Sequence, residues 1–451
     1  MRKLVTAMVA IILVALPAVA QFSSNGMQFY KENNQSAINQ FETTKADTTP
    51  YDGVKVKLGG AFALQFQALD HSNSALEVLN KDGINLNQLK ALTNTFNTAT
   101  ANMNIDVQLA DGIRMEIVTY LSSRHHNEAW VKGGYLQIDK LPFIKSAMVD
   151  NIMDHVTIRV GHMGINYGDA QFRRTDNGNA FFNPFVGNYI MDAFATEVGG
   201  EVYVKFNPFF VMGGVTNGLI KGDAAMPSVI KTNADGTKDT TYGTNPSILG
   251  KAGFDKQIND DLRIRLTGSI YYNARTQRNT LYGGDRAGAR YYYVMANTLA
   301  TATDQFTTGR FNPGLNNKVT AFVINPFVKF HGAELFANYE IAKGGAASEI
   351  EDRTWTQIGV DGLYRFGKTE NFYIGGRYNT VKGDMLGYDV QPSITRIAGA
   401  FGWFITPNIL TKVEYVNQTY DGWGESLKNP NTHINTGGEF HGIMIEGAIN
   451  F

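Results

Sequence analysis

The stretch DLRIRLTGSIYY (residues 261–272) alternates apolar and polar residues over most of its length. One set contains Leu262, Ile264, Leu266 and Ile270, and the other contains Arg263, Arg265, Thr267 and Ser269. Because successive side chains of a β-strand point to opposite faces of a sheet, this pattern predicts a strand with one apolar face and one face that carries two arginines. The fold depends on which of these faces points outward.

The same period of two recurs through most of the chain. Together with 261–273, the candidate strands are the two halves of the hairpin at 104–121 and the segments near 52–69, 129–138, 155–163, 194–206, 209–217, 247–256, 318–330, 332–342, 354–366, 371–381, 393–404, 408–418 and 437–451. This makes about 16 strands of roughly 9–11 residues or slightly more, which is the length that crosses a bilayer at a tilt. Short turns such as Asp111-Gly112 alternate with long polar segments such as 219–246 and 274–317, as in a transmembrane barrel.

Two segments depart from this plan. Residues 140–154 stand where a short turn is expected, so the sequence predicts either an extra element there or an error of one hairpin in the strand count. Residues 74–92 carry apolar residues at helical spacing, from Ala75 and Leu76 to Leu89. That spacing predicts a short helix in the first long loop.

Composition excludes several classes of protein. The 451 residues include 47 glycines, 12% aromatic residues and no cysteine. Without cysteine there is no disulfide, thiolate metal site or cysteine nucleophile. The balance of 40 Lys+Arg against 41 Asp+Glu argues against a nucleic-acid-binding protein, which would be basic.

The N-terminus predicts export. Arg2 and Lys3 precede an apolar run at 4–16 and the small-residue site Ala18-Val19-Ala20, which is the pattern of a signal peptide over residues 1–20. The alternative, an N-terminal membrane anchor, would need roughly 20 apolar residues. The polar segment 21–50 predicts a flexible N-terminal arm, and residues 51–451 would form one barrel.

An Arg that faces lipid at the bilayer midplane costs about 2–4 kcal/mol, and several would exceed a typical stability of roughly 5–15 kcal/mol. The apolar faces are therefore predicted to meet lipid and the charged faces a wet lumen. The predicted fold class is an all-β, antiparallel, up-and-down transmembrane β-barrel of about 16 strands, with long extracellular loops and short periplasmic turns. Aromatic residues near strand ends, such as Phe209-Phe210 and Tyr271-Tyr272, would form the interfacial girdles.

The predicted lumen carries many charged groups. Alternation points the following side chains inward: Lys55, Lys57, Arg114, Glu116, Arg159, Arg263, Arg265, Lys329, Glu334, Glu340, Asp361, Arg365, Arg377, Arg396, Lys412 and Glu414. This set is more basic than acidic, and positive rings favour anions. The candidate pore-lining residues are Arg173, Arg174, Arg159, Arg263, Arg265, Arg114, Lys55, Lys57 and Arg396.

The loop 165–193 contains Arg173 and Arg174. It either folds into the barrel and narrows the pore, with these arginines at the constriction, or remains an ordinary surface loop. Arg263 and Arg265 follow a short turn, so they are expected low in the lumen, away from the narrowest point, where they would draw anions through the exit.

Three segments resemble a known family. EAWVKGGYLQIDK (128–140), VTIRVGHMGINYGDAQFRRT (156–175) and TEVGGEVYVKFNPFFVMGGVTNG (196–218) look like the corresponding strands and constriction loop of the phosphate-selective porin O/P type. The resemblance implies an outer-membrane barrel with inward arginines, matched here by local position at Arg159, Arg173 and Arg174. The final strand ending in Phe451 also resembles the signal by which outer-membrane barrels are recognised for insertion.

The function expected from these patterns is an outer-membrane porin, a water-filled channel for small hydrophilic solutes with mild anion, including phosphate, preference. The alternatives are a plugged barrel for structure or surface interaction, and an outer-membrane enzyme that uses histidines such as His125 and His126. Neither enzyme activity, nor a cofactor or metal, nor a nucleic-acid partner is expected. The expected partners are outer-membrane lipid, small anions or other solutes, the barrel-assembly machinery and, by analogy with porins, two further copies in a homotrimer.

Overall fold

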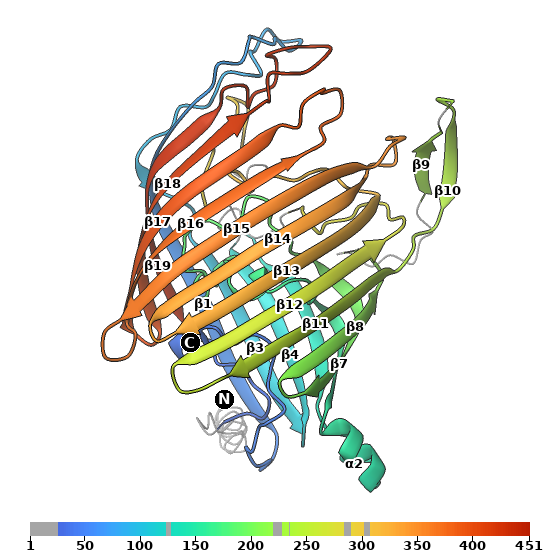
Figure 1. The fold of residues 1–451 in the computed structure, drawn as a ribbon, viewed down its shortest axis with the longest axis vertical. Coiled ribbons are helices and arrows are strands. Elements are labelled where there is room, and N and C mark those ends of the chain that lie inside the picture. The colour runs from blue at the N-terminus through green and yellow to red at the C-terminus, as the bar shows by residue number, and fades with distance from the viewer. Residues whose placement is uncertain (1–25, 123–127, 220–227, 234, 284–289, 302–306) are drawn as a thin grey trace, which may run out of the picture.

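Sixteen long antiparallel strands close into a barrel (Figure 1). The structure is a computed structural model that describes residues 26–122, 128–219, 228–233, 235–283, 290–301 and 307–451. The barrel strands are β1 (Lys55–Ser72), β3 (Thr100–Ala110), β4 (Ile113–Ser122), β5 (Trp130–Ile138), β6 (Val156–Gly164), β7 (Thr196–Phe206), β8 (Phe209–Thr216), β11 (Ser247–Gln257), β12 (Leu262–Asn273), β13 (Lys318–Phe330), β14 (Ala333–Gly345), β15 (Arg353–Phe366), β16 (Phe372–Gly383), β17 (Ser393–Thr406), β18 (Ile409–Asp421) and β19 (Glu439–Asn450).

The shorter elements lie outside this cycle. The two-residue strand β2 (Thr95–Phe96) pairs with β1. Strands β9 (Ser228–Thr232) and β10 (Lys238–Tyr242) form a separate hairpin that stands away from the barrel in Figure 1. The helical elements are η1 (Gln35–Ala37), α2 (Ala147–Met153) and η2 (Ala170–Phe172). No helix in the described part of the chain is long and apolar enough to cross a membrane.

Closure depends on the length of β1. Its first half, Lys55 to Ala63, pairs with β3, and its second half, Ala61 to Ser72, pairs with β19. One 18-residue strand therefore joins the first and last hairpins of the barrel. Pairing of β1 with both of its neighbours closes the cycle of strands and removes the open sheet edge that a lipid environment does not tolerate.

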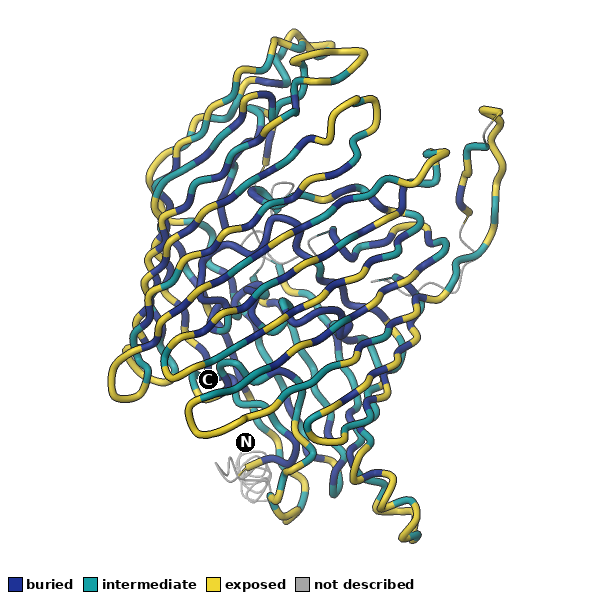
Figure 2. The backbone as a smooth tube through the Cα atoms, in the orientation of Figure 1, coloured by how far each residue is buried: buried dark blue, intermediate teal, exposed yellow. Residues whose placement is uncertain are grey.

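Burial shows that the barrel is inverted relative to a soluble protein. On β12, Leu266, Ile270 and Tyr272 are exposed, whereas Arg265 and Thr267 are buried. Figure 2 shows the same alternation of exposed and buried residues on the neighbouring strands. Exposed apolar residues around a closed sheet, with charged residues inside, are the pattern of a transmembrane barrel. The predicted fold class, strand count and orientation of the opening stretch are confirmed.

The aromatic pairs at strand ends contribute only one residue each to the outer surface. Phe209 and Tyr272 are exposed, whereas Phe210 and Tyr271 point into the lumen. Adjacent residues of a strand face opposite sides, so a pair of aromatics cannot lie in one girdle. The prediction that both members of each pair form the girdles was therefore wrong.

The two irregular segments have different outcomes. The connection 140–154 contains the additional helix α2, so an extra element, and not a missed hairpin, explains its length. The segment 74–92 forms no helix, and that prediction was wrong. Asn80 Oδ1 accepts hydrogen bonds from the backbone amides of Asp82 and Ile84, and Leu79 pairs with Asn85. Side-chain hydrogen bonds of asparagine to the local backbone stabilise turns in competition with helix.

Candidate functional site

Residues 26–50, called the N-terminal strap, lie across the barrel end that carries the short turns. Gln28 Nε2 donates to Asp111 Oδ1 (3.0 Å) in the β3–β4 turn, and the Gln35 amide donates to the Pro407 carbonyl (2.9 Å) in the β17–β18 turn. Phe41 is buried inside the barrel. The sequence predicted a flexible arm, but the described part of this segment is packed and hydrogen-bonded to turns around the barrel opening. The predicted signal peptide lies outside the described residues.

Residues 165–195, called the inner loop, fold into the lumen. Lys412 on β18 donates to the carbonyls of Ala180 (3.0 Å), Asn183 (3.0 Å) and Phe185 (2.9 Å). Arg377 on β16 donates to the Gly187 carbonyl (2.7 Å). Inward cations of the wall thus hold the backbone of the loop. Of the two alternatives for this loop, the structure has the one in which it enters the barrel.

The two arginines of the opening stretch anchor these segments. Arg265 binds both carboxylate oxygens of Asp169 in the inner loop (2.8 and 2.8 Å) and Glu42 of the strap (2.7 Å). Arg263 forms a bidentate pair with Asp255 (2.8 and 2.7 Å). Bidentate guanidinium–carboxylate pairs are strong and directional. Both arginines face the lumen, as predicted, but their charges are matched by nearby carboxylates, which argues against the expected role of drawing anions.

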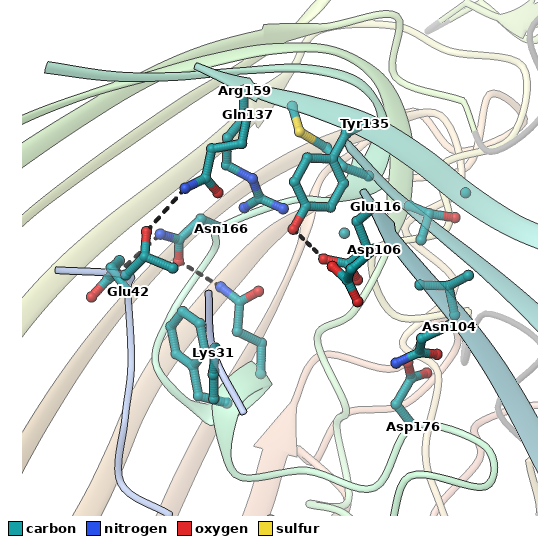
Figure 3. Close-up of a pocket in the computed structure, with 18 of the residues that line it drawn as sticks. Lys31, Glu42, Asn104, Asp106, Glu116, Tyr135, Gln137, Arg159, Asn166 and Asp176 are labelled. Atoms are coloured by element: carbon teal, nitrogen blue, oxygen red, sulfur yellow. Dashed lines mark hydrogen bonds between the residues drawn. The ribbon is translucent and has the colours of Figure 1, made fainter. Parts of the chain in front are cut away.

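A cavity of about 290 Å³ remains between the strap, the inner loop and the wall formed by β3 to β7 (Figure 3). Its charged lining comprises the six cations Lys31, Arg114, Lys132, Arg159, Arg174 and Lys205, and the five carboxylates Glu32, Glu42, Asp106, Glu116 and Asp176. Charged groups at this density require water or a polar solute beside them. The cavity is therefore the candidate functional site.

The predicted pore-lining residues divide into two groups. Arg114, Arg159 and Arg174 line the cavity. The others do not line the cavity themselves, and each has a partner: Arg173 with Asn39 and Glu334, Arg263 and Arg265 in the network described above, Arg396 with Gln418 and the Asn188 carbonyl, Lys55 with Asp52, and Lys57 with Glu32. Alternation indicated the inward face correctly, but it carries no information about partners across the lumen.

Sequence reasoning missed the contribution of the strap. Lys31, Glu32 and Glu42 line the cavity, yet their segment has neither strand nor helix periodicity. The available signal was the presence of Phe29, Tyr30 and Phe41 in an otherwise polar stretch. Large aromatic residues tend to be buried, and Phe29 and Phe41 are.

Arg159 is the cavity arginine with the weakest pairing. Its Nη1 lies 3.5 Å from Glu201 and 3.4 Å from the Tyr203 hydroxyl, and its Nε has no hydrogen-bond partner among the described residues. The guanidinium lies 4.1 Å from the centroid of the Tyr135 ring. A cation held over an aromatic ring with donors unused is available to bind a solute.

Lys31 gives the cavity a charge that depends on pH. Burial lowers the pKa of Lys31 from 10.5 to about 8, and Glu42 and Glu116 partly offset the shift, because removal from water disfavours the charged ammonium. Lys31 is thus protonated below about pH 8 and loses its charge as the pH rises further. We expect the reversal potential of a conducting channel to move toward cations between pH 7 and pH 9. Lys31→Met should reduce this shift, and an identical shift in Lys31→Met would contradict the prediction.

The histidines proposed for an enzyme are dispersed. His71 contacts the Lys90 carbonyl and the Met295 amide, and His331 pairs with Asp261 in an exposed turn. His125 and His126 lie outside the described residues. Among the residues that the structure describes, no group of three or more His, Asp or Glu side chains is placed to hold a metal ion.

Comparison with known proteins supports the fold. The anion-selective porin from Comamonas acidovorans has a TM-score of 0.51 at 12% identity, covering 88% of this chain and 100% of that chain. The outer membrane channel DcaP of Acinetobacter baumannii (TM-score 0.49, 10% identity, 89% and 99% coverage) and the outer membrane protein OmpT of Vibrio cholerae (0.49, 11%, 89% and 99%) are also similar. No protein-family model matches the sequence, and no curated protein matches it. The likeness is one of fold alone, that of a closed barrel such as outer-membrane porins have.

Proposed function

We propose that this protein is an outer-membrane porin through which small hydrophilic solutes diffuse. The observation that carries the proposal is the charged cavity inside an inverted barrel. A packed core would exclude charged groups, and a barrel of about 16 strands is wide enough for an aqueous path. The cavity of about 290 Å³ is at the low end of ligand-sized pockets, so the solutes are small.

The charge of the lining supports a mild anion preference. The cavity lining contains six cations and five carboxylates, and Arg159 is only weakly paired. Ion selectivity in a pore follows the charges that line it. The resemblance of the segments 128–140, 156–175 and 196–218 to the phosphate-selective porin O/P type makes phosphate the anion to test after chloride.

The reversal potential across a KCl gradient in planar bilayers tests this preference. We expect the wild-type protein to favour chloride, and the variant with Arg159→Gln and Arg174→Gln to move toward potassium, because both arginines line the cavity. Arg263→Gln is the matched control, since Arg263 is paired outside the cavity lining. An unchanged reversal potential in the double variant would show that these arginines do not determine the ion selectivity.

A plugged barrel for structure or surface interaction is the second candidate. The inner loop packs Phe181, Phe185 and Ile190 into a buried cluster with residues of β13 to β19. That side of the lumen is therefore filled by protein, and the open volume lies on the side of β3 to β7. Absence of conductance, together with binding of the intact barrel to a surface, would favour this candidate.

Location and partners follow from the same proposal. Export through a signal peptide at residues 1–20 and insertion into the outer membrane would place the exposed apolar band in lipid. Phe451 is exposed on the outside of the barrel, and its backbone pairs with Gly60 (3.0 Å), so its ring is accessible to the barrel-assembly machinery. We propose a homotrimer by analogy with porins.

A further inference from the structure

The charges around the cavity are separated into two sides. In Figure 3, Asp106 and Glu116 lie on one side of the open space, Arg159 lies above it beside Tyr135, and Lys31 lies below it. The acidic side comes from β3 and β4, and the basic side from the strap and β6. The remaining carboxylates of the lining are matched individually: Glu32 by Lys57, Glu42 by Lys251 and Arg265, and Asp176 by Lys132 and Arg174.

The acidic side carries more negative charge than its partner neutralises. Asp106 and Glu116 are directly opposite each other on β3 and β4, and like charges at such positions destabilise a sheet. Arg114 is shared between them, with Nη1 at 3.3 Å from Asp106 and 3.7 Å from Glu116. Asn104 Oδ1, which also lines the cavity, accepts no hydrogen bond from the described residues. This side therefore offers carboxyl and amide oxygens as hydrogen-bond acceptors to a solute.

The basic side carries donors that are incompletely used. Lys31 Nζ donates to the Gln40 carbonyl (2.6 Å), and Lys205 donates to the Thr43 carbonyl. Among the described residues, no carboxylate lies within ion-pair distance of either lysine. Arg159 adds its unpaired Nε and a distant contact of 3.5 Å with Glu201. This side therefore attracts a negative group of a solute.

Tyr135 stands between the two sides. Its ring lies under the Arg159 guanidinium, and its hydroxyl donates to Glu116 (Figure 3). Tyr135 thus separates the Arg159 guanidinium, which lies over its ring, from the Glu116 carboxylate, which binds its hydroxyl. A solute that carries only one charge would meet attraction on one side of the cavity and repulsion on the other.

We infer that the cavity favours small zwitterions, with the ammonium group toward Asp106 and Glu116 and the carboxylate toward Arg159 and Lys31, so that amino acids are preferred solutes. The inference rests on the proposed function, because it concerns passage through the same cavity. Each charged end of an amino acid would replace lost hydration with a charge-assisted hydrogen bond. This preference is compatible with a mild selectivity for chloride, since the two tests compare different solutes.

Uptake of four labelled solutes of nearly equal size into proteoliposomes at zero potential tests the inference. The set is alanine (zwitterion), lactate (anion), alaninamide (cation) and lactamide (neutral). We expect alanine to enter at least severalfold faster than lactamide and faster than either singly charged solute. Alanine entry no faster than lactamide entry would overturn the inference while leaving the porin proposal intact. No entry of lactamide would overturn both.

Variants then test the acidic side. Glu116→Gln, alone and with Asp106→Asn, should abolish the advantage of alanine over lactamide and should speed lactate, because the repulsive carboxylates are gone. The single variant is included because it leaves the Arg114–Asp106 pair in place. Asp260→Asn, in the exposed turn between β11 and β12, is the control and should retain the advantage. Retention of the full advantage in the double variant would overturn the inference.

Discussion

Deletion of residues 21–50, which joins the predicted signal peptide (residues 1–20) to residue 51 and removes the strap, is expected to raise single-channel conductance severalfold. The strap supplies Lys31, Phe41 and Glu42 to the cavity lining and crosses the barrel end that carries the short turns. Its removal would join the cavity to that opening. The conductance of a wide aqueous path exceeds that of a constricted one, and single-channel recording in planar bilayers measures the change directly.

A deletion elsewhere provides the control for this experiment. The hairpin Ser228–Tyr242 stands away from the barrel and forms its own two-stranded sheet. Its removal shortens the chain without touching the cavity lining, so conductance should stay at the wild-type value. Equal conductance in the wild-type protein and the strap deletion would show that the strap does not restrict the path.

Arg265→Met is expected to give the largest loss of stability of any single change in the opening stretch. Arg265 is buried and binds Asp169, Glu42 and Asp255. Removal of one partner from a buried ionic network leaves uncompensated charge and typically costs about 3–5 kcal/mol. The measurement is the free energy of unfolding in urea, followed by the gel mobility of the folded barrel in detergent.

Arg263→Met is the matched control, because it removes the same residue type from the same face of β12. Its pair with Asp255 is partly exposed, at 25% and 22%, and such pairs contribute roughly 0–1 kcal/mol. Asp169→Asn combined with Arg265→Met should recover part of the lost stability, since the carboxylate that loses its arginine partner is also removed. Equal losses for Arg263→Met and Arg265→Met would contradict the anchoring role of Arg265.

The fold was predictable because every strand of a membrane barrel alternates apolar and polar residues. A period of two in DLRIRLTGSIYY and its counterparts indicated both the strands and, through the cost of charge in lipid, the face that turns inward. The incorrect predictions concern segments in which this period of two is absent. The segment 74–92 showed helical spacing, but asparagine side chains such as Asn80 bind the local backbone and form turns instead.

The site was only partly predictable for a related reason. Alternation placed Arg114 and Arg159 inside the barrel, and both line the cavity. It could not show that Arg265 would meet Glu42, a residue 223 positions away in a segment without periodicity. Contacts across the lumen depend on how the strap and inner loop fold inside it, so one strand seen alone does not reveal which charges remain unpaired.

The entry of a small neutral sugar into proteoliposomes shows whether the lumen is open, because it requires an aqueous path through the barrel and no particular charge. Osmotic swelling in arabinose reports this entry, with protein-free liposomes as the baseline. We expect rapid swelling in arabinose and much slower swelling in a larger sugar such as raffinose, given the cavity of about 290 Å³. Swelling in arabinose no faster than in protein-free liposomes would contradict the claim that the lumen is a channel.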